Sequence, residues 1–438
     1  MKHVLKISIA AALLIACNKT PVTSLAGARS QVPHGPGLEM LAQNIWQLTQ
    51  RSSGQAEASR MMLSLRTADH DPVGLRKNAN TPLIVNVTII SGNALPQLLV
   101  GSYDRETVTS YNLQPGTNTI SGAAGDLYLK FAADQPSAGN KVKVEFVSGF
   151  SVLPFYILGT TTNQQWKTML AGDTLPNVVL VSKRAFVVCS RTKAIEFQDK
   201  NQDSALLYID SALNAEHAFS GLDGSTAADK TWEGKIMIVE RTGGYMDATH
   251  EGRVRVVGSS FSRVLDHTVI TGNGWGLFHE MGHHHQMWNW TFGAVGEVNP
   301  NIYTLAAYRK IKSGYTWLTG SKWTAVQQYL ALPDSSRNYT TSQASGDVRL
   351  ALYQQLWLAF GDNFYHNLHQ LVRAEKPSPA GNAEEEMRVL MLYASRASGK
   401  DLGSFFRKWG FKVSQSVYDE ITNLSLPAPS VDITTLHE

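Results

Sequence analysis

The sequence predicts an α+β protein, in which an N-terminal antiparallel β-sandwich precedes a larger α+β body with a mostly helical C-terminal half. The sandwich is predicted by residues 81–149, where short runs of alternating apolar and polar residues are separated by turn-forming clusters such as LQPGTN. The body is predicted by apolar runs that alternate with helical stretches until Gly274, after which helical periodicity dominates. These strand-like runs are residues 177–182, 185–190, 235–241 and 253–260.

Four segments are expected along the chain. Residues 1–17 carry an export signal, and residues 18–78 form a tether followed by a short helical segment, because residues 41–50 (LAQNIWQLTQ) show a weak helical period. The β-sandwich domain covers residues 79–150, and the α+β body covers residues 151–438. A chain of 438 residues is long enough for two or three domains with a sizeable buried core.

Composition excludes two classes of protein. The chain is 43% hydrophobic and 17% charged, so it lacks the low hydrophobicity and high net charge of a disordered chain. Its formal net charge of +3 gives no sign of a polyanion-binding surface. We therefore expect a globular monomer that does not bind nucleic acid. Cys189, one of only two cysteines, is expected in the core.

The N-terminus resembles a bacterial lipoprotein signal. Lys2 and Lys6 precede an apolar run at residues 7–16, which is too short to span a bilayer core of ~30 Å. The run ends in Leu-Ile-Ala-Cys, similar to a lipobox whose cysteine, here Cys17, is acylated after cleavage. The alternative is an ordinary signal peptide with an incidental cysteine. We expect an exported bacterial lipoprotein, anchored by lipid in the cell envelope at the outer membrane or cell surface.

The stretch GLFHEMGHHHQ contains four histidines in seven positions and is expected to lie on a helix that starts at Asn273 or Gly274. On a helix, His279 and His283 project from one face one turn apart, as two imidazoles on a single tetrahedral zinc ion require. Glu280 then lies beside the zinc-bound water and can accept its proton. The motif predicts a hydrolytic zinc site with one ion per chain.

The other two histidines of the stretch cannot join the same set of ligands. His284 and His285 are rotated by about 140° and 240° from His279 on an ideal helix. They are expected either to support the ligands from behind or to lie at the surface.

A third protein ligand is expected downstream, because a catalytic zinc ion usually has three. The metzincin pattern is excluded, since it requires Gly at position 286 and His at position 289, where this chain has Gln286 and Asn289. Glu297 lies 14 residues after His283, at the start of an apolar-periodic segment that can return as a helix. The alternative for Glu297 is an acid that stabilises a helix N-terminus.

The sequence HEMGHHHQ followed by GEVNPNIYTL resembles the enhancin-like, mucin-directed gluzincin zinc metallopeptidases. The resemblance extends over roughly residues 80–400, from FYILGTTTNQQWKTML to LYQQLWLAFGDNFYHNLHQLVRAE. It implies that His279, His283 and Glu297 bind zinc and that Glu280 is the catalytic base. It also implies a β-sandwich followed by a zincin-like (gluzincin) catalytic domain. Many members of this family cut glycoproteins beside O-glycosylated Ser or Thr.

The expected function is therefore that of a secreted or surface-anchored zinc metallopeptidase whose partners are O-glycosylated, mucin-type proteins. Two alternatives stay open. One is a zinc peptidase that cuts unglycosylated proteins or cell-wall peptides and shares every catalytic residue. The other is a glycan-binding surface lipoprotein with a non-catalytic zinc site, although structural zinc sites usually have four protein ligands, often including Cys.

Four further side chains are candidates for roles near the zinc ion. Gln286 is expected to orient a ligand or to bind substrate, with an ordinary polar role as the alternative. The oxyanion that forms during hydrolysis needs a hydrogen-bond donor, for which Tyr303, His267 and Tyr353 are candidates. The alternative for these three is a structural role, because aromatic residues at helical spacing usually lie in the core.

Substrate contacts beyond the metal are also expected. An extended peptide is predicted to pair with an edge strand supplied by residues 235–244 or 253–260. Trp275, Trp288 and Trp290 are the tryptophans nearest in sequence to the zinc ligands and are candidates for stacking on sugar rings, with core packing as the alternative.

Overall fold

The computed structural model describes residues 37–102, 107–379 and 381–438. Cys17 and the export signal predicted at residues 1–17 lie outside these described residues. Within the described part of the chain, no helix is both long and apolar enough to cross a membrane.

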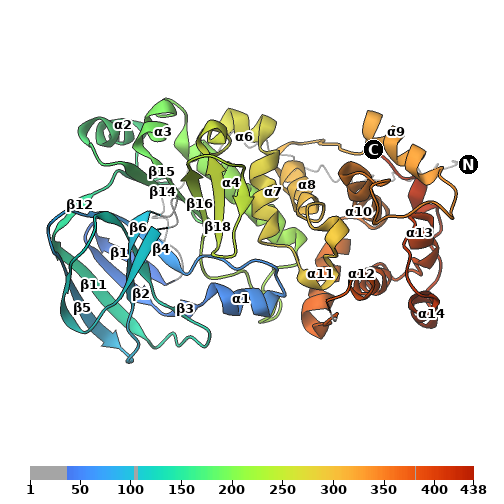
Figure 1. The fold of residues 1–438 in the computed structure, drawn as a ribbon, viewed down its shortest axis with the longest axis horizontal. Coiled ribbons are helices and arrows are strands. Elements are labelled where there is room, and N and C mark those ends of the chain that lie inside the picture. The colour runs from blue at the N-terminus through green and yellow to red at the C-terminus, as the bar shows by residue number, and fades with distance from the viewer. Residues whose placement is uncertain (1–36, 103–106, 380) are drawn as a thin grey trace, which may run out of the picture.

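The N-terminal part contains two five-stranded antiparallel sheets (Figure 1). The first sheet has the order β1 (Leu38–Ala42), β2 (Ile45–Thr49), β11 (Lys141–Ser148), β5 (Leu83–Ser91) and β8 (Gly116–Ile120). The second has the order β12 (Phe150–Val152), β4 (His70–Lys77), β9 (Gly125–Lys130), β6 (Gln97–Ser102) and β7 (Thr107–Asn112). Apolar side chains from both sheets share one core, which includes Trp46, Val85 and Leu129.

The helix predicted for residues 41–50 is wrong. In β2 the buried residues Trp46 and Leu48 alternate with half-exposed neighbours, which is the period of two that a strand requires. Pairing of β2 with β11 overrides the weak helical period. A short helix does follow, as α1 (Gly54–Met61), whose N-cap Ser53 accepts a hydrogen bond from the amide of Ala56. Residues 38–77 therefore contribute strands to both sheets.

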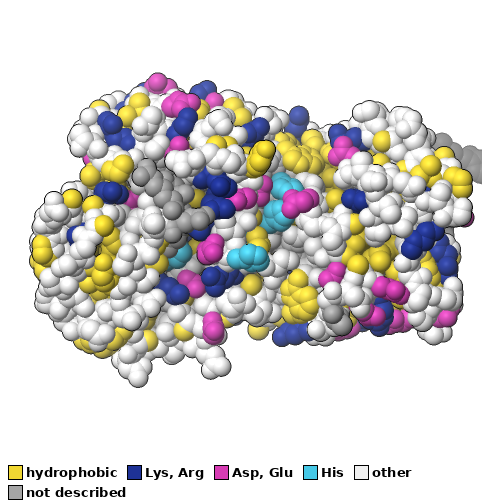
Figure 2. All heavy atoms as spheres, in the orientation of Figure 1, with side chains coloured by type: hydrophobic (Ala, Val, Ile, Leu, Met, Phe, Trp, Pro, Cys, Tyr) yellow, Lys and Arg dark blue, Asp and Glu magenta, His cyan; other side chains and the backbone are white. Residues whose placement is uncertain are grey.

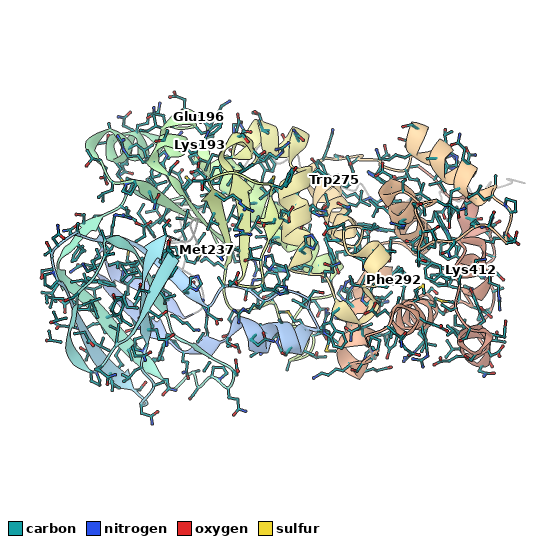
Figure 3. All side chains as sticks on the ribbon, in the orientation of Figure 1. Lys193, Glu196, Met237, Trp275, Phe292 and Lys412 are labelled. Carbon is teal, nitrogen blue, oxygen red and sulfur yellow. The ribbon has the colours of Figure 1, made fainter. Side chains whose placement is uncertain are left out.

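A six-stranded mixed sheet forms the centre of the molecule. Its order is β13 (Phe155–Ile157), β14 (Asn177–Val181), β15 (Ala185–Ser190), β16 (Ile236–Arg241), β18 (Arg253–Val257) and β17 (Asp247–Ala248). Side chains that alternate along each strand face two different layers. Val178 and Ile238 pack with the helices, whereas Val179 and Met237 face the second N-terminal sheet, as Figure 3 shows for Met237.

The four strand-like runs predicted in this region are confirmed as β14, β15, β16 and β18. The edge strand predicted at residues 235–244 is wrong, because β16 is hydrogen-bonded on both sides, to β15 and to β18. The other run, β18, pairs with β16 along its length and with only two residues of β17 on its second side. Cys189 is buried in β15, as predicted, and burial raises the pKa of its thiol.

The chain after Gly274 is mostly helical, as predicted. The glutamate run at residues 384–386 lies in the first turn of α12, where the side chain of Asn382 caps the amide of Glu385. The helices before and within this half are α2 (Asn163–Gly172), α3 (Arg191–Glu196), α4 (Gln202–Phe219), α5 (Ser262–Leu265), α6 (His267–Asn273), α7 (Trp275–His283), α8 (Pro300–Ile311), α9 (Gly320–Leu330), α10 (Gly346–Phe360), α11 (Asn363–Glu375), α12 (Ala383–Ser398), α13 (Gly403–Lys408) and α14 (Gln415–Asn423).

The N-terminal chain also reaches the helical core. Residues 62–64, here called the crossing segment, leave α1 and run beside the chain that follows α7. The amide of Ser64 donates to the carbonyl of Gln286 over 2.8 Å, and the amide of Trp288 donates to the carbonyl of Met62 over 3.2 Å. Met62 and Leu63 are buried in the hydrophobic core of the helical half. The N-terminal and helical parts are thus joined by both hydrogen bonds and apolar packing.

Candidate metal centre

Helix α7 carries the histidine stretch and is placed by its apolar face. Leu277, Phe278 and Met281 are fully buried between the central sheet and its covering helices. The helix ends at His283, where the chain turns away. Gly282 permits close contact with the next helix, because a Cβ atom there would lie 2.5 Å from the carbonyl oxygen of Pro300, the first residue of α8.

This contact between α7 and α8 brings Glu297 to the histidines. The Glu297 Oε2 atom lies 3.2 Å from His279 Nε2 and 3.5 Å from His283 Nε2. One ligand atom from each of the three residues falls within 4.8 Å of the other two. The Glu297 side chain is 82% exposed, so the cluster opens to solvent. Figure 2 shows histidine beside acidic side chains in the middle of one face, over α7.

Two amide side chains fix the orientation of the histidine rings. The Asn301 amide nitrogen donates to the Glu297 carbonyl over 3.0 Å, so the Asn301 Oδ1 atom faces His279 Nδ1 at 2.8 Å. The Gln286 amide nitrogen likewise donates to the Gly296 carbonyl over 2.8 Å, so Gln286 Oε1 faces His283 Nδ1 at 3.0 Å. Since an amide oxygen only accepts, each Nδ1 carries a proton. Each Nε2 then faces the cluster, as a lone pair when the ring is neutral and as a donor to Glu297 when the ring is protonated.

Glu280 lies next to His279 on α7 and is nearly buried. Burial raises the pKa of its carboxyl group, and the nearby histidines counteract this only in part. The pKa of Glu297 is instead lowered, first by its hydrogen bonds with His279 and His283. Glu297, whose pKa is lowered, is therefore suited to holding a cation. Glu280, whose pKa is raised, is suited to exchanging a proton.

His284 and His285 lie on the far side of the same turn and are completely buried. Of the two locations predicted for them, the one at the surface is wrong, because the N-terminal chain and α4 cover this side. His285 Nε2 lies 2.9 Å from Nδ1 of His217, and its Nδ1 lies 3.3 Å from a carboxylate oxygen of Glu216. Burial lowers the pKa of His284 to about 4 and that of His285 to about 3, so both rings are neutral at neutral pH.

The proposed oxyanion donors are placed away from the cluster. The Tyr303 hydroxyl is buried, where it donates to the His285 carbonyl and lies 2.8 Å from His369 Nε2. Tyr353 is also fully buried, and His267 begins α6. Among the described residues, no hydrogen bond or ion pair joins Tyr303, Tyr353 or His267 to the His279, His283 and Glu297 side chains.

The tryptophans near the site have distinct positions. Trp290 is fully buried in the helical core, so its predicted alternative of core packing is the one observed. Trp288 packs against the same core and is partly buried. Trp275, at the start of α7 (Figure 3), donates from its indole nitrogen to Asn301 Oδ1 over 2.9 Å. Trp275 therefore helps to hold the amide that orients His279.

Asn301 is the residue of this site that the sequence analysis missed. Its signal was present in the spacing, because Asn301 lies four residues after Glu297 and therefore about one helical turn further on. The spacing of a metal-binding motif indicates the direct ligands but not the residues that orient them.

The geometry agrees with a comparison of the chain with known protein families. Residues 149–410 match the family described as Peptidase M60, enhancin and enhancin-like. The chain belongs to this family.

Solved structures share the peptidase M60 fold over most of the chain. A conserved protein of unknown function from Bacillus anthracis is 26% identical, with a TM-score of 0.78 over 89% of this chain and 80% of that one. The ZmpB metallopeptidase from Clostridium perfringens is 22% identical, with a TM-score of 0.75 over 90% and 82%. A metallopeptidase in complex with Tn antigen is 17% identical, with a TM-score of 0.77 over 90% and 80%.

A curated relative matches this chain over part of its own length. The TRPM8 channel-associated factor 3 of Mus musculus is 22% identical over 324 residues, which are 72% of this chain and 34% of that protein. The chain thus spans about a third of the length of the curated relatives it matches.

Proposed function

We propose that this chain is a zinc metallopeptidase that hydrolyses peptide bonds in O-glycosylated, mucin-type glycoproteins. The observation that carries the proposal is the convergence of two Nε2 lone pairs and one carboxylate beside the nearly buried Glu280, in a member of the peptidase M60 family. We also infer that the N-terminal sheets form a β-sandwich domain before a zincin-like (gluzincin) catalytic domain.

The donor set of the cluster fits a catalytic zinc ion. Two imidazole nitrogens and one carboxylate oxygen are a recurring set of three ligands, and the open side of the cluster leaves a position for water or substrate. A structural zinc site would need a fourth protein ligand. Cys189, the one cysteine in the described part of the chain, is buried in β15, within the core of the central sheet. This observation disfavours the non-catalytic alternative.

The chain's own groups then divide the work of hydrolysis. His279, His283 and Glu297 would hold a zinc ion, which would supply the Lewis-acid chemistry that activates water and polarises a peptide carbonyl. Glu280 accepts the proton of the attacking water at its carboxylate and delivers it to the leaving amine. Its raised pKa brings it closer to the pH at which it must both take and give a proton.

The substrate class is supported by two relatives of known structure. The M60 catalytic domain of ZmpC from Clostridium perfringens was solved in complex with sialyl T antigen, and a further metallopeptidase was solved with Tn antigen. Both ligands are O-glycan antigens, and both proteins share the fold of this chain. We extend this substrate class to the present chain as part of the proposal.

We further propose that the protein is exported and anchored by acylation of Cys17, as its N-terminus predicts. Metabolic labelling with a radioactive or clickable fatty acid should label the wild-type chain, and Cys17→Ser should abolish both the label and signal cleavage. A wild-type chain that is unlabelled and cut elsewhere would support the ordinary signal peptide instead.

The substrate proposal is tested with a matched pair of peptides that differ only in one O-linked sugar on Ser or Thr. The value of kcat/KM for the glycopeptide should exceed that for the bare peptide by at least about tenfold, because sugar contacts remote from the scissile bond stabilise the transition state. Glu280→Gln is the control and should cut neither peptide. Equal rates would favour the alternative of a peptidase for unglycosylated proteins or cell-wall peptides.

A further inference from the structure

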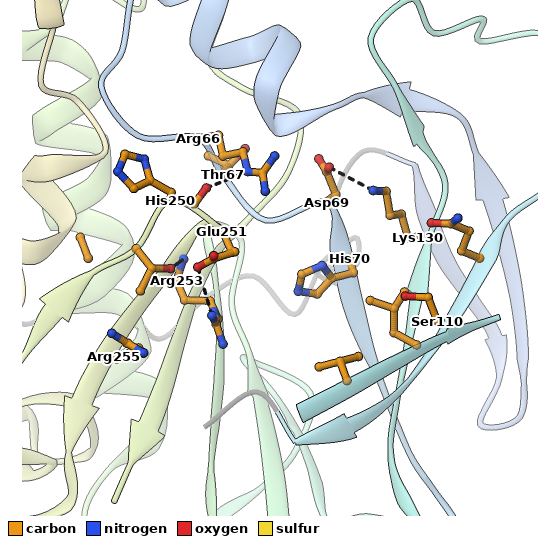
Figure 4. Close-up of a pocket in the computed structure, with 15 residues that line it drawn as sticks. Arg66, Thr67, Asp69, His70, Ser110, Lys130, His250, Glu251, Arg253 and Arg255 are labelled. Carbon is orange, nitrogen blue, oxygen red and sulfur yellow. Dashed lines mark hydrogen bonds and ion pairs between the residues drawn. The ribbon is translucent and has the colours of Figure 1, made fainter. Parts of the chain in front are cut away.

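A cavity of about 700 Å³ lies between the second N-terminal sheet and the edge of the central sheet (Figure 4). Its walls come from β4, β6, β7 and β9 on one side and from β17, β18 and the loop between them on the other. We call it the inter-sheet cavity. Its volume falls in the range of pockets that enclose small ligands.

One wall is built by a change of residue type within the central sheet. On β16, Met237 and Val239 face the N-terminal sheet and pack against it. Their register partners on the next strand are Arg253 and Arg255. The contact between the two sheets is therefore apolar up to β16 and becomes cationic at β18. Burying an arginine costs free energy unless its charge is paired within the protein or by a bound ligand. The change from apolar residues on β16 to arginines on β18 is therefore informative.

The opposite wall changes in the same way. On β9, Tyr128 packs in the apolar contact, and Lys130, two residues further on the same face, lines the cavity. Lys130 is in register with His70 on β4 and with Gln97 on β6. These three side chains form a polar row across three neighbouring strands. On both walls, the apolar contact between the two sheets gives way to polar side chains where the cavity begins.

The balance of charge in the cavity is positive. Its lining contains the four basic residues Arg66, Lys130, Arg253 and Arg255 but only the two acids Asp69 and Glu251.

Both acids already have partners. Glu251 pairs with Arg253 at 3.2 Å, and Lys130 lies 3.4 Å from Asp69, as Figure 4 shows. Asp69 also accepts a hydrogen bond from the amide of Gly54, at the start of α1, so part of its charge is engaged there. Arg255 is paired with Asp247, outside the lining.

The buried His70 responds to this positive charge. Its pKa is lowered first by burial and then by Arg51, Arg253, Lys130 and Arg66. Three of these four cations line the cavity.

The cavity lies close to the metal centre, and the carboxylate of Asp247 stands between them. Asp247 on β17 binds Arg255 of the cavity wall and Arg241, and β17 packs against α7, which carries the histidines. Met246, the residue before Asp247, lies close to α7, because a Cβ atom built on Gly276 would be 3.3 Å from the Met246 sulfur. Figure 2 shows basic side chains over β16 and β18, on the same face as the histidines over α7.

From this arrangement we propose that the inter-sheet cavity binds an anionic carboxylate group carried by the glycoprotein whose peptide bond lies at the metal centre. The proposal rests on the proposed function, because it assigns a specificity pocket to that substrate. Guanidinium and ammonium groups are the protein's strongest donors to such anions. The anion has two sources, an acidic sugar of the O-glycan or an acidic side chain of the peptide.

The test measures binding to the full chain carrying Glu280→Gln, so that no hydrolysis is needed. Three probes share one peptide: a neutral O-linked disaccharide, the same glycan with one N-acetylneuraminic acid, and the neutral glycan with one added Asp in the peptide. Isothermal titration calorimetry at low ionic strength should give a Kd at least about tenfold lower for one acidic probe than for the neutral probe. The acidic probe that is preferred identifies the source of the anion.

Two variants and one control locate the effect. Lys130→Gln should reduce the preference below about threefold, and Gln97→Glu, which adds a negative charge to the same row, should reduce it as well. Lys230→Gln, which removes an exposed lysine outside the cavity lining, should leave the preference unchanged. Gln97→Glu removes no cation, so it keeps the test decisive if Lys130→Gln folds poorly.

The results separate the cavity from the proposed function. Equal Kd values for all three probes, absence of binding to any of them, or an equal loss in Lys130→Gln and Lys230→Gln would overturn the assignment of the cavity. Preferential binding of an acidic probe, together with no cleavage of any glycopeptide by the wild-type chain, would support the cavity and overturn the proposed peptidase.

Discussion

Two pairs of histidines lie on α7 and directly after its end, and their surroundings differ completely. His279 and His283 have their Nδ1 atoms held by amide oxygens and their Nε2 lone pairs turned to an open cluster with Glu297. His284 and His285 are fully buried and neutral. The comparison teaches that residue type alone does not make a metal site. What matters is which ring nitrogen is left as a free lone pair, and whether several such atoms converge.

The region behind α7 is rich in the same residue types but is arranged for packing. His285 contacts His217 and Glu216 from α4, and the Tyr303 hydroxyl joins its backbone to His369 of α11. This network links three helices beneath the metal centre. We expect changes on the open side of α7 to affect metal and turnover, and changes on the buried side to affect stability.

The largest effect is expected on the open side. His279→Ala should abolish zinc retention, measured by inductively coupled plasma mass spectrometry on the dialysed protein. Glu280→Gln should keep about one zinc ion per chain and lower kcat by about 10²–10⁴, because it removes the proton acceptor and leaves the ligands intact. Retained activity in Glu280→Gln would contradict the role of Glu280. Normal zinc content and rate in Glu297→Ala would show that another residue is the third ligand.

A smaller effect is expected from the amides that orient the rings. Asn301→Ala and Gln286→Ala should weaken zinc affinity by about 10–100-fold, because each removes the acceptor that fixes one histidine tautomer. Competition with a chromophoric chelator measures this affinity. Gln370→Ala, which removes a surface amide on α11, is the matched control and should bind zinc normally. Unchanged affinity in both variants would mean that the rings are oriented by helix geometry alone.

On the buried side, Tyr303→Phe should lower the free energy of unfolding by about 1–3 kcal/mol, because the carbonyl of His285 and the ring of His369 each lose a buried partner. Zinc content should stay at the wild-type value. Urea unfolding monitored by tryptophan fluorescence measures the first quantity. A loss of zinc without a loss of stability would instead place Tyr303 in the catalytic site.

The smallest effect is expected in the pH dependence of stability. Burial lowers the pKa of His369 to about 3, so the unfolded chain binds a proton below pH 6.5 that the folded chain does not. The contribution of His369 to the free energy of unfolding is therefore fully present above pH 6.5. It declines by up to about 1.4 kcal/mol per pH unit as the pH falls toward 3. His369→Gln should make the free energy of unfolding less dependent on pH by that amount. Buried Glu216, whose pKa is raised well above 4.5, contributes with the opposite sign at pH values above 4.5, so the comparison of wild type with His369→Gln, which both keep Glu216, isolates the contribution of the histidine.

Spacing along the chain was enough to predict the cluster itself. Four residues on a helix bring His279 and His283 to one face. The apolar-periodic segment that follows, like the family resemblance, pointed to Glu297, which the structure places beside them. Their role as zinc ligands stays a prediction. Spacing could not reveal that Gly282 admits the backbone of Pro300, which is the contact that brings Glu297 back.

Other features depended on contacts that no local pattern contains. The stretch at residues 41–50 has a weak helical period, but pairing with β11, about a hundred residues later, makes it a strand. His284 is buried because the N-terminal chain covers it. The arginines of β18 indicate a polar cavity wall only once their register with the apolar residues of β16 is known. These are tertiary relations between distant segments, and one-dimensional periodicity carries no record of them.

The crossing segment decides where this protein can be shortened. The family match begins at residue 149, yet Ser64 and Met62 complete the backbone hydrogen bonds of Gln286 and Trp288. A fragment that starts at residue 149 would lack these partners and would expose the part of the helical core that Met62 and Leu63 fill. An expression unit should therefore keep the crossing segment together with the strands of the N-terminal sheets, which include β1. By the same reasoning, proteolytic removal of the residues before 65 should destabilise the helical core and leave every residue of the candidate metal centre in place.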